Sequence, residues 1–199
     1  RLLAQRAYKT VVGRLATLAR KGKTPQARLH ALYTLDGLAA LEPALIGHAL
    51  ADPHYAVRVH ALRLAENRLD DTPELLDKLV QMVDDSDPSV RLQLAYTLGQ
   101  SKTGKAVETL ASLAMRHGDD RWMQAAVVSS AVDSADRLLR KILEKGPGLP
   151  GGQALLHPLA STVGARHNDS QIGNLLATVA AAKGESVGPL KVACLKGLI

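Results

Sequence analysis

The sequence predicts an all-α solenoid, in which antiparallel pairs of helices stack one on another. The main observation is a helical motif that returns along the chain with the same residue position marked by Arg28, Arg58, Arg91 and then Gln124. The steps of 30, 33 and 33 residues between these positions are typical of stacked helix pairs. A second observation is that no stretch alternates apolar and polar residues well enough to predict a strand.

The composition suits helices that pack closely side by side. Of the 199 residues, 46% are hydrophobic, whereas only 3% are aromatic and phenylalanine is absent. The expected core therefore consists of leucine, alanine and valine, whose small side chains allow a near approach of helices. No apolar run reaches the roughly 20 residues that are needed to span a bilayer.

The first two helices are marked by spacing and by a turn. Apolar residues at helical spacing indicate a helix over residues 2–20. The segment Lys21–Pro25 ends this helix and begins the next one, with Thr24 as the N-cap and Pro25 in the first turn. The second helix is expected to end near residue 41.

Three proline turns begin the following helices. Glu42-Pro43 starts a short helix through residue 51, and Asp52-Pro53 turns into a helix over residues 57–67, because proline fixes its own φ and restricts the residue before it. Thr72 is expected to cap the helix that begins at Pro73.

The remaining helices are expected over residues 73–84, 88–100, 104–117, 120–131, 133–145, 153–165, 170–183 and 187–198. Gly118 is expected to end one of them, since glycine is favoured just after a helix. About twelve helices in six antiparallel pairs result.

A glycine- and proline-rich stretch interrupts the repeats at residues 146–152, and we expect a loop there because this composition cannot continue a helix. The predicted organisation is a repeat block over residues 1–145, this loop, and divergent helical repeats over residues 153–199 that complete the same solenoid.

The motif at Asp52–Ala61, Asp-Pro-x-x-x-Val-Arg-x-x-Ala, resembles the second helix of a HEAT repeat. Asp87-Pro88-Ser89-Val90-Arg91 is a shortened version of it, and the resemblance extends over residues 25–131. It implies a right-handed HEAT-like α-solenoid. In HEAT repeats an aspartate and an arginine form a ladder between neighbouring repeats. The resemblance therefore implies that Asp52 with Arg58, and Asp87 with Arg91, are structural, and Arg28 holds the same place one repeat earlier.

A narrower resemblance rests on the segments ARLHALYTLDGL, ALADPHYAVRVHALRLAE and PSVRLQLAYTLG. They are similar to the HEAT segment of large planctomycete-type exported proteins, which also carry a β-propeller resembling sugar dehydrogenases and a c-type cytochrome domain. This similarity implies a segment of a larger multidomain protein in the periplasm, and a chain that begins at Arg1 fits that expectation. Cys194 is followed by Leu195-Lys196-Gly197 and lacks the CxxCH motif, so no haem attachment is expected.

The resemblance implies a non-catalytic protein-interaction or spacer module. Its expected partner is another protein or a neighbouring domain of the same chain. A solenoid presents a long surface for such contacts. The candidate partner surface consists of inner-helix residues and one unusual cluster: Arg63, Gln93, Tyr96, Asp120, Trp122 and Gln124.

Two other functions stay open. One is nucleic-acid binding, as in HEAT-like DNA glycosylases, through the residues Arg20, Lys21, Lys23, Arg121 and Trp122. The simpler interpretation of that last cluster is that Asp119 or Asp120 caps a helix and Trp122 fills a gap between helix pairs. The other function is that of a lyase or chaperone-like helper of a chromophore protein, where HEAT-like repeats also occur.

Charge is distributed unevenly along the chain, whose net charge is +6. Residues 1–35 carry eight basic residues and no acidic one, whereas residues 66–88 carry eight acidic residues and two basic ones. Solvated helix faces are the simpler interpretation, and a basic docking surface is the more specific one.

No catalytic residue, metal or cofactor is expected. The seven histidines form no HExxH motif, and no serine stands in a nucleophile-elbow pattern. His30 and His60 occupy the same position in successive repeats, where helices lie about 8–10 Å apart. A polar ladder between repeats is therefore a better interpretation of these two histidines than a shared metal.

Overall fold

The computed structural model describes residues 2–145, 150–181, 191–192 and 194–196, with side chains from residue 8 onward. These residues form helices and contain no strand, so the predicted all-α class of stacked helices is confirmed. The chain divides into two compact units, Arg1–Leu94 and Ala95–Ile199. The boundary predicted at residues 146–152 therefore lies inside the second unit.

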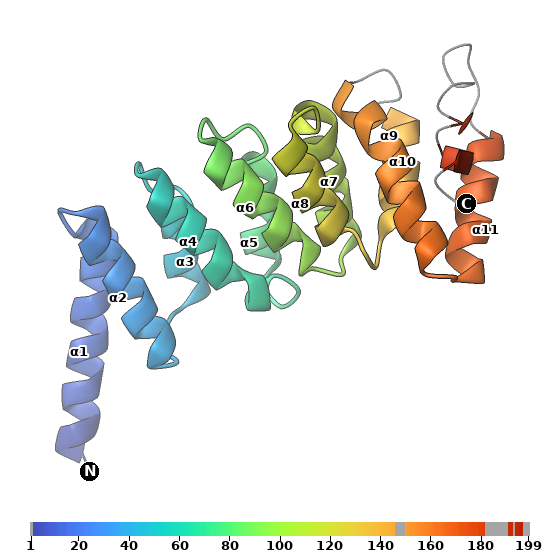
Figure 1. Ribbon diagram of the computed structural model, residues 1–199. Coiled ribbons are helices and arrows are strands. Elements are labelled where there is room, and N and C mark those ends of the chain that lie inside the picture. Colours follow the sequence, from blue (N-terminus) through green and yellow to red (C-terminus); the bar gives the residue numbers. More distant parts are fainter. Residues whose placement is uncertain (1, 146–149, 182–190, 193, 197–199) are drawn as a thin grey trace. The chain divides into compact units, whose positions relative to one another are not determined.

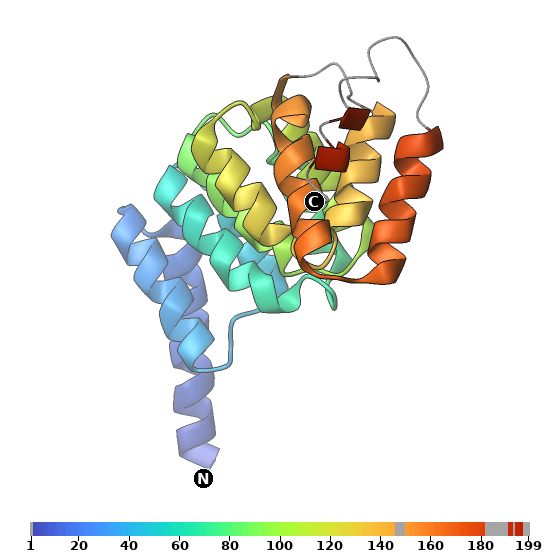
Figure 2. The same ribbon diagram turned by 45° about the vertical axis from the view of Figure 1, so that its right-hand side comes forward.

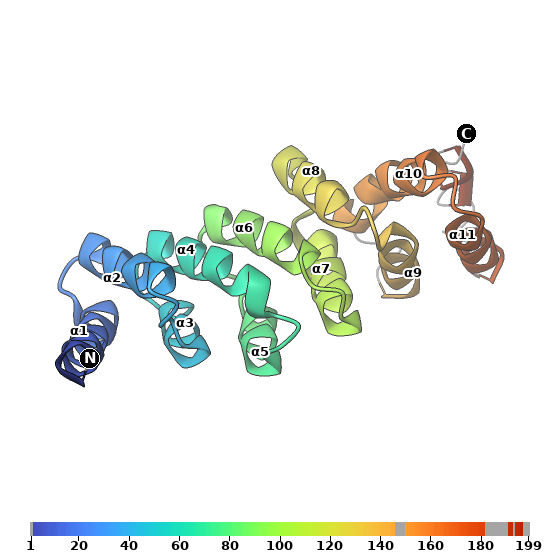
Figure 3. The same ribbon diagram turned by 90° about the horizontal axis from the view of Figure 1, so that it is seen from below.

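The first unit has two layers of helices (Figures 1 and 3). One layer contains α1 (Leu2–Lys21), α3 (Pro43–Ala49) and α5 (Pro73–Gln81), and the other contains α2 (Pro25–Gly37) and α4 (Tyr55–Ala65). A short 3₁₀ turn, η1 (Glu66–Arg68), extends α4, and α6 (Pro88–Gly99) crosses the boundary between the units. Helix α1 packs on α2 and on α3, and α3 packs on α4 and on α5.

The second unit repeats this arrangement. It contains α7 (Gly104–His117), α8 (Arg121–Ser130), α9 (Ala135–Lys145), α10 (Pro150–Ala165) and α11 (Asp169–Ala181). Helix α9 packs between α7 and α11, and α10 packs on α7, α8 and α9 (Figure 2). The described residues thus contain eleven α-helices and one 3₁₀ turn. Most of the helix predicted over residues 187–198 lies outside the described residues.

The core is aliphatic, as the composition predicts. Fully buried side chains of the first unit include Leu32, Leu35, Ile46, Leu62 and Leu79, and those of the second include Leu98, Leu110, Leu113 and Leu138. Burying one such side chain contributes roughly 1.5–3 kcal/mol, and close stacking of α-helical layers follows from the lack of large aromatic residues. None of the described helices combines the length and the apolar character that crossing a membrane requires.

The predicted helix-end signals at Thr24 and Gly118 are confirmed. The Thr24 hydroxyl accepts from the Ala27 N–H at 3.2 Å, and α7 ends at Gly118. Thr72 stands at the N-cap position of α5, as predicted, but its side chain makes no capping bond. Its backbone conformation, φ −135° and ψ 82°, differs from that of Thr24 at φ −108° and ψ 146°, and the hydroxyl does not serve the first turn.

The loop predicted over residues 146–152 extends too far at its C-terminal end. Helix α10 begins at Pro150, so Gly151 and Gly152 are helical and buried, while residues 146–149 lie outside the described part of the chain. Proline is favoured in the first turn of a helix, where its missing N–H leaves no bond unmade. Gly151, the residue after it, permits a close approach to the end of α7.

Candidate functional site

The side chain of each residue that marks the repeat register donates a hydrogen bond to the backbone carbonyl six positions before it. This carbonyl lies in the turn between the two helices of a pair, and a buried carbonyl needs a donor. The donors and acceptors are Arg28 Nη1 to Gly22 O at 2.8 Å, Arg58 Nη1 to Asp52 O at 2.9 Å, Arg91 Nη1 to Asp85 O, and Gln124 Nε2 to Gly118 O at 3.0 Å. The same geometry recurs with glutamine at the fourth position, because either side chain supplies the donor.

Two of these arginines also bind the aspartate of the following repeat through two guanidinium nitrogens, Nε and Nη2. Arg28 contacts Asp52 with Nε–Oδ2 2.6 Å and Nη2–Oδ1 2.7 Å. Arg58 contacts Asp85 with corresponding distances of 2.8 and 2.7 Å. The side chains are largely buried, with exposed fractions of 11% and 3% in the first pair and 13% and 10% in the second. Two parallel charge-assisted bonds in a fixed plane align one repeat on the next.

The partners in this ladder differ from those that the resemblance suggested. Asp52 pairs back to Arg28, and Arg58 reaches forward to Asp85 instead of Asp52. Asp87 is not part of either rung, because Arg58 binds Asp85, and the Asp87 carboxylate accepts from the nearby Ser89 N–H at 2.8 Å. The ladder aspartates are the residues six before a marked arginine. Counting back six from Arg91 gives Asp85, so this spacing identifies the aspartate once the fold has shown which position forms the rung.

The charge of Asp52 is stabilised by this pairing. Burial alone raises the pKa of the Asp52 carboxyl, but hydrogen bonds from Arg28 and from the His54 N–H at 2.9 Å outweigh it, so the pKa lies below its usual value. The same pairing raises the pKa of the Arg28 guanidinium. Both ends of the rung are therefore charged at neutral pH.

We expect the Arg28–Asp52 rung to make the free energy of unfolding depend on pH in the acid range. The lowered pKa of Asp52 means that the unfolded state takes up a proton before the folded state does, so the stabilisation is present above the unfolded pKa of about 3.9 and disappears as the pH falls through the folded value. In urea titrations at pH 7 to 2, wild type should exceed Asp52→Asn in free energy of unfolding at pH 7, and the gap should shrink below about pH 4. Asp71→Asn, which removes an exposed acid, is the control. A gap that stays constant to pH 2 would show that the charge of Asp52 contributes nothing.

A second polar network lies on α2, α4 and the start of α6, all in the first unit. The Tyr33 hydroxyl forms a hydrogen bond with His60 Nδ1 at 2.7 Å. The two rings pack edge to face, with their centroids 5.5 Å apart. Arg63 Nε donates to Gln93 Oε1 at 2.9 Å, and Gln93 Nε2 donates to Glu66 Oε1 at 3.0 Å. Burial, with Arg63 nearby, lowers the pKa of His60. The imidazole is therefore neutral near pH 7.

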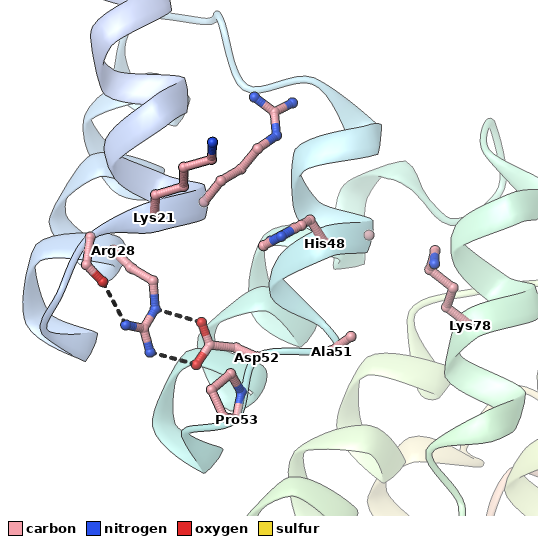
Figure 4. A pocket seen from close by; sticks show the side chains of 10 residues that line it. Lys21, Arg28, His48, Ala51, Asp52, Pro53 and Lys78 are labelled. Carbon is pink, nitrogen blue, oxygen red and sulfur yellow. Dashed lines mark hydrogen bonds and ion pairs between the residues drawn. The ribbon is translucent and has the colours of Figure 1, made fainter.

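A pocket of about 520 Å³ opens on the other layer of the first unit (Figure 4). Its walls come from the ends of α1, α3 and α5 and from the turn before α4. Basic side chains from all three helices line it: Arg20, Lys21, His48 and Lys78. We call these four residues the basic rim. The Arg28–Asp52 rung also lines the pocket, and the two charges of that rung offset each other.

Residues 42–131 match the protein-family model that describes HEAT repeats. The matched range contains α3 to α8 and the whole Arg58–Asp85 rung. No curated protein matches the chain. HEAT repeats suggest a protein-interaction or scaffold module.

Of the six residues predicted to form a partner surface, three hold the helical repeats together and are not available for a partner. Gln93 is buried and holds Arg63 and Glu66, and Gln124 binds the Gly118 carbonyl. Asp120 caps α8, because its carboxylate accepts from the N–H groups of Trp122 and Met123 at 2.9 Å. The three exposed members are Arg63, Tyr96 and Trp122.

The simpler interpretation of Trp122, as a plug between helix pairs, was wrong. Its side chain is 63% exposed, and the Arg121 guanidinium lies over its ring at 5.0 Å from the centroid. The reason is helical phase: Met123, Ala126 and Val127 form the buried stripe of α8, and Trp122 precedes that stripe by about 100°. The expected cap by Asp120 is confirmed.

The histidines and the cysteine bear on the expectations about metal binding and thiol chemistry. His60 bonds to Tyr33 and not to His30, which is exposed. In the part of the chain that the structure describes, no three histidine, cysteine, aspartate or glutamate side chains gather as metal ligands. Cys194 is buried, and burial raises the pKa of its thiol to about 11, so the thiol is protonated at neutral pH.

Sequence reasoning missed Tyr33 and the pocket residues His48 and Lys78. Tyr33 stands five positions after Arg28, as Arg63 does after Arg58, so the repeat register would have identified it. His48 and Lys78 could have been found as basic residues in the last turns of successive first-layer helices, α3 and α5.

Proposed function

We propose that the chain is a non-catalytic protein-interaction module and that its first unit binds a partner protein through Tyr33 and Arg63. The observation that carries this proposal is that both side chains are exposed, hold the same register in successive HEAT repeats, and have their polar ends tied to a neighbouring helix. We call this pair the Tyr–Arg row.

The chemistry of the Tyr–Arg row suits a protein contact. Tyrosine and arginine, with tryptophan, are the residue types that contribute most to binding energy at interfaces. A side chain already held in place loses less conformational entropy when a partner binds. Tyr33 is fixed by His60 and Arg63 by Gln93, so the row presents a pre-organised surface. Tyr96 holds the same register in the second unit and is 40% exposed.

Site-specific photo-crosslinking tests the proposal. A benzophenone amino acid placed at Tyr33, in the protein expressed in its source cells, should crosslink to a discrete protein. The same group at Tyr55, which is also an exposed tyrosine of the first unit, is the matched control. The crosslink at position 33 should weaken roughly tenfold or more with Arg63→Ala, as expected for a central interface arginine. Equal crosslinking from both positions, or none from position 33, would overturn the assignment of this surface.

We further propose, on the resemblance of the repeat motifs to exported multidomain proteins, that the module works in the periplasm as a spacer between neighbouring domains. The open reading frame of the gene tests this. An export signal upstream and a CxxCH motif downstream are the expected findings, and a frame with neither would contradict the proposal.

Nucleic-acid binding has less support as an alternative. Arg121 covers one face of the Trp122 ring, which leaves a single face for a base. Single-stranded nucleic acids bind proteins through several aromatic platforms along a basic groove, and base stacking on one tryptophan contributes only about 1–3 kcal/mol.

A further inference from the structure

We propose that the pocket bounded by the basic rim is a second binding site, which takes a short acidic peptide segment with two or more carboxylates. It lies at the ends of α1, α3 and α5, whereas the Tyr–Arg row lies on α2 and α4. The inference therefore does not depend on the Tyr–Arg row.

The pocket has an uncompensated positive charge. Within the described part of the chain, no hydrogen bond or ion pair holds Arg20, Lys21 or Lys78. The only carboxylate in the lining is Asp52, and Arg28 already binds both of its oxygens. Three cations with no partner in a concave site attract an anion more strongly than three cations scattered on a convex surface.

The negative ends of the helix dipoles offset only part of the positive charge around the pocket. All four residues of the basic rim stand in the last turn of a helix, where a cation is favoured because the helix carries roughly half a negative charge at its C-terminus. Three such termini amount to about one and a half negative charges, which is less than the three full positive charges of the pocket. A net attraction for anions remains.

The position of Lys78 is supported by a glycine. A Cβ atom added at Gly47 would lie 3.0 Å from Lys78 Cε and 3.2 Å from Cδ, so the lysine chain lies directly on the α3 backbone. Gly47 thereby lets the alkyl part of Lys78 pack while its ammonium group faces the pocket.

The placement of the cations favours a ligand with several anionic groups. In Figure 4, Lys21 and Lys78 extend from opposite sides of the pocket, with His48 between them. A single phosphate is best bound by groups that converge on it. Cations on two separate walls instead match carboxylates that are spaced along a peptide, and about 520 Å³ accommodates a few side chains.

A long polyanion fits less well than a short peptide. Residues 66–88 carry eight acidic residues, and Glu74 and Asp77 stand on α5, the helix that also carries Lys78. A nucleic-acid backbone that continued past the pocket over α5 would meet this negative charge, and like charges repel. In addition, no tyrosine, tryptophan or phenylalanine lines the pocket as a platform for stacking a base.

Fluorescence anisotropy of the full chain tests the proposal with a labelled short peptide of alternating aspartate and glutamate, about five residues long. The matching peptide of asparagine and glutamine is the ligand control. The variant Arg20→Gln/Lys21→Gln/Lys78→Gln should bind roughly tenfold more weakly, since each exposed ion pair contributes about two- to threefold. The variant Lys9→Gln/Arg14→Gln/Lys23→Gln removes the same charge from exposed sites of the first unit outside the pocket and should lose less than about threefold.

A further variant separates geometry from net charge. Gly47→Ala keeps every charge but displaces the flexible end of Lys78, so binding should weaken by roughly twofold while the thermal melt stays near that of wild type. Binding should also weaken as salt rises from about 50 to 150 mM.

Several results would overturn the inference. They are equal loss in the two triple variants, no measurable binding of the acidic peptide, and displacement of the peptide by inorganic phosphate at a comparable concentration, which would indicate a single-anion site. Tighter binding of a 12-mer DNA with the same dependence on Arg20, Lys21 and Lys78 would assign the pocket to nucleic acid. Crosslinking at Tyr33 with no peptide binding would leave the proposed function standing and reject this site alone.

Discussion

Replacing Arg58 with alanine is expected to lower the free energy of unfolding by about 2–4 kcal/mol, because it leaves the carboxylate of Asp85 buried without its partner. The change also removes the donor that Arg58 Nη1 offers to the Asp52 carbonyl at 2.9 Å. Urea unfolding followed by circular dichroism measures the loss. Arg68→Ala is the matched control, since Arg68 pairs with Asp36 at 29% and 36% exposure, and its loss should stay below about 1 kcal/mol.

A double variant tests whether the rung itself is responsible. Asp85→Asn removes the charge and keeps an oxygen that can accept from the Asp87 N–H, as Asp85 Oδ1 does at 3.0 Å. Combined with Arg58→Ala it should destabilise less than the sum of the two single changes, because no charge is left unpaired. If the two losses simply add, or if Arg58→Ala melts like wild type, the rung contributes nothing to stability.

The register of the repeats could be predicted from the sequence, and the partners in the ladder could not. Arg28, Arg58 and Arg91 show the period because each supplies a donor to the same turn carbonyl. The motif places Asp52 and Asp87 directly before proline, so both look equivalent by sequence. Only the fold shows that the rung needs the residue six before the arginine, which is Asp85 in the later repeat.

Side-chain exposure was harder to predict than helix positions. An amphipathic pattern places Met123 inside and says nothing about whether Trp122, one position earlier, is covered by a neighbouring helix. The candidate site has the same difficulty. Tyr33 and Arg63 share a register that is visible in the sequence, but their anchoring by His60 and Gln93 depends on contacts between helices about 30 residues apart in the chain.

Gly151, at the start of α10, shows that a glycine near a proline can have either of two opposite roles. Glycine near proline usually marks a break, and residues 146–152 were predicted as one on that ground. Gly151 instead lies in the first turn of α10, against the end of α7. A sequence does not distinguish a glycine that provides flexibility from one that permits two backbones to touch, because the second role depends on a partner elsewhere in the chain.

Gly151→Ala is therefore expected to destabilise the chain by about 1–3 kcal/mol through overpacking. A Cβ atom at this position would lie 2.5 Å from the Ala114 carbonyl oxygen, 2.8 Å from the Gly118 nitrogen and 2.9 Å from the Met115 carbonyl oxygen. All three are backbone atoms, which cannot swing aside as a flexible side chain can. The measurement is the midpoint of urea unfolding together with its slope, so that a change in stability is separated from a change in the unfolded state.

Gly173→Ala in α11 is the matched control, since nothing lies within 4 Å of a Cβ atom added there. Alanine has a higher helix propensity than glycine, and this exchange should stabilise the chain by roughly 0.5–1 kcal/mol. The two substitutions are chemically identical and are expected to act in opposite directions. If both stabilise the chain, α10 does not pack closely on the end of α7, and residues 150–152 belong to the loop that the sequence predicted.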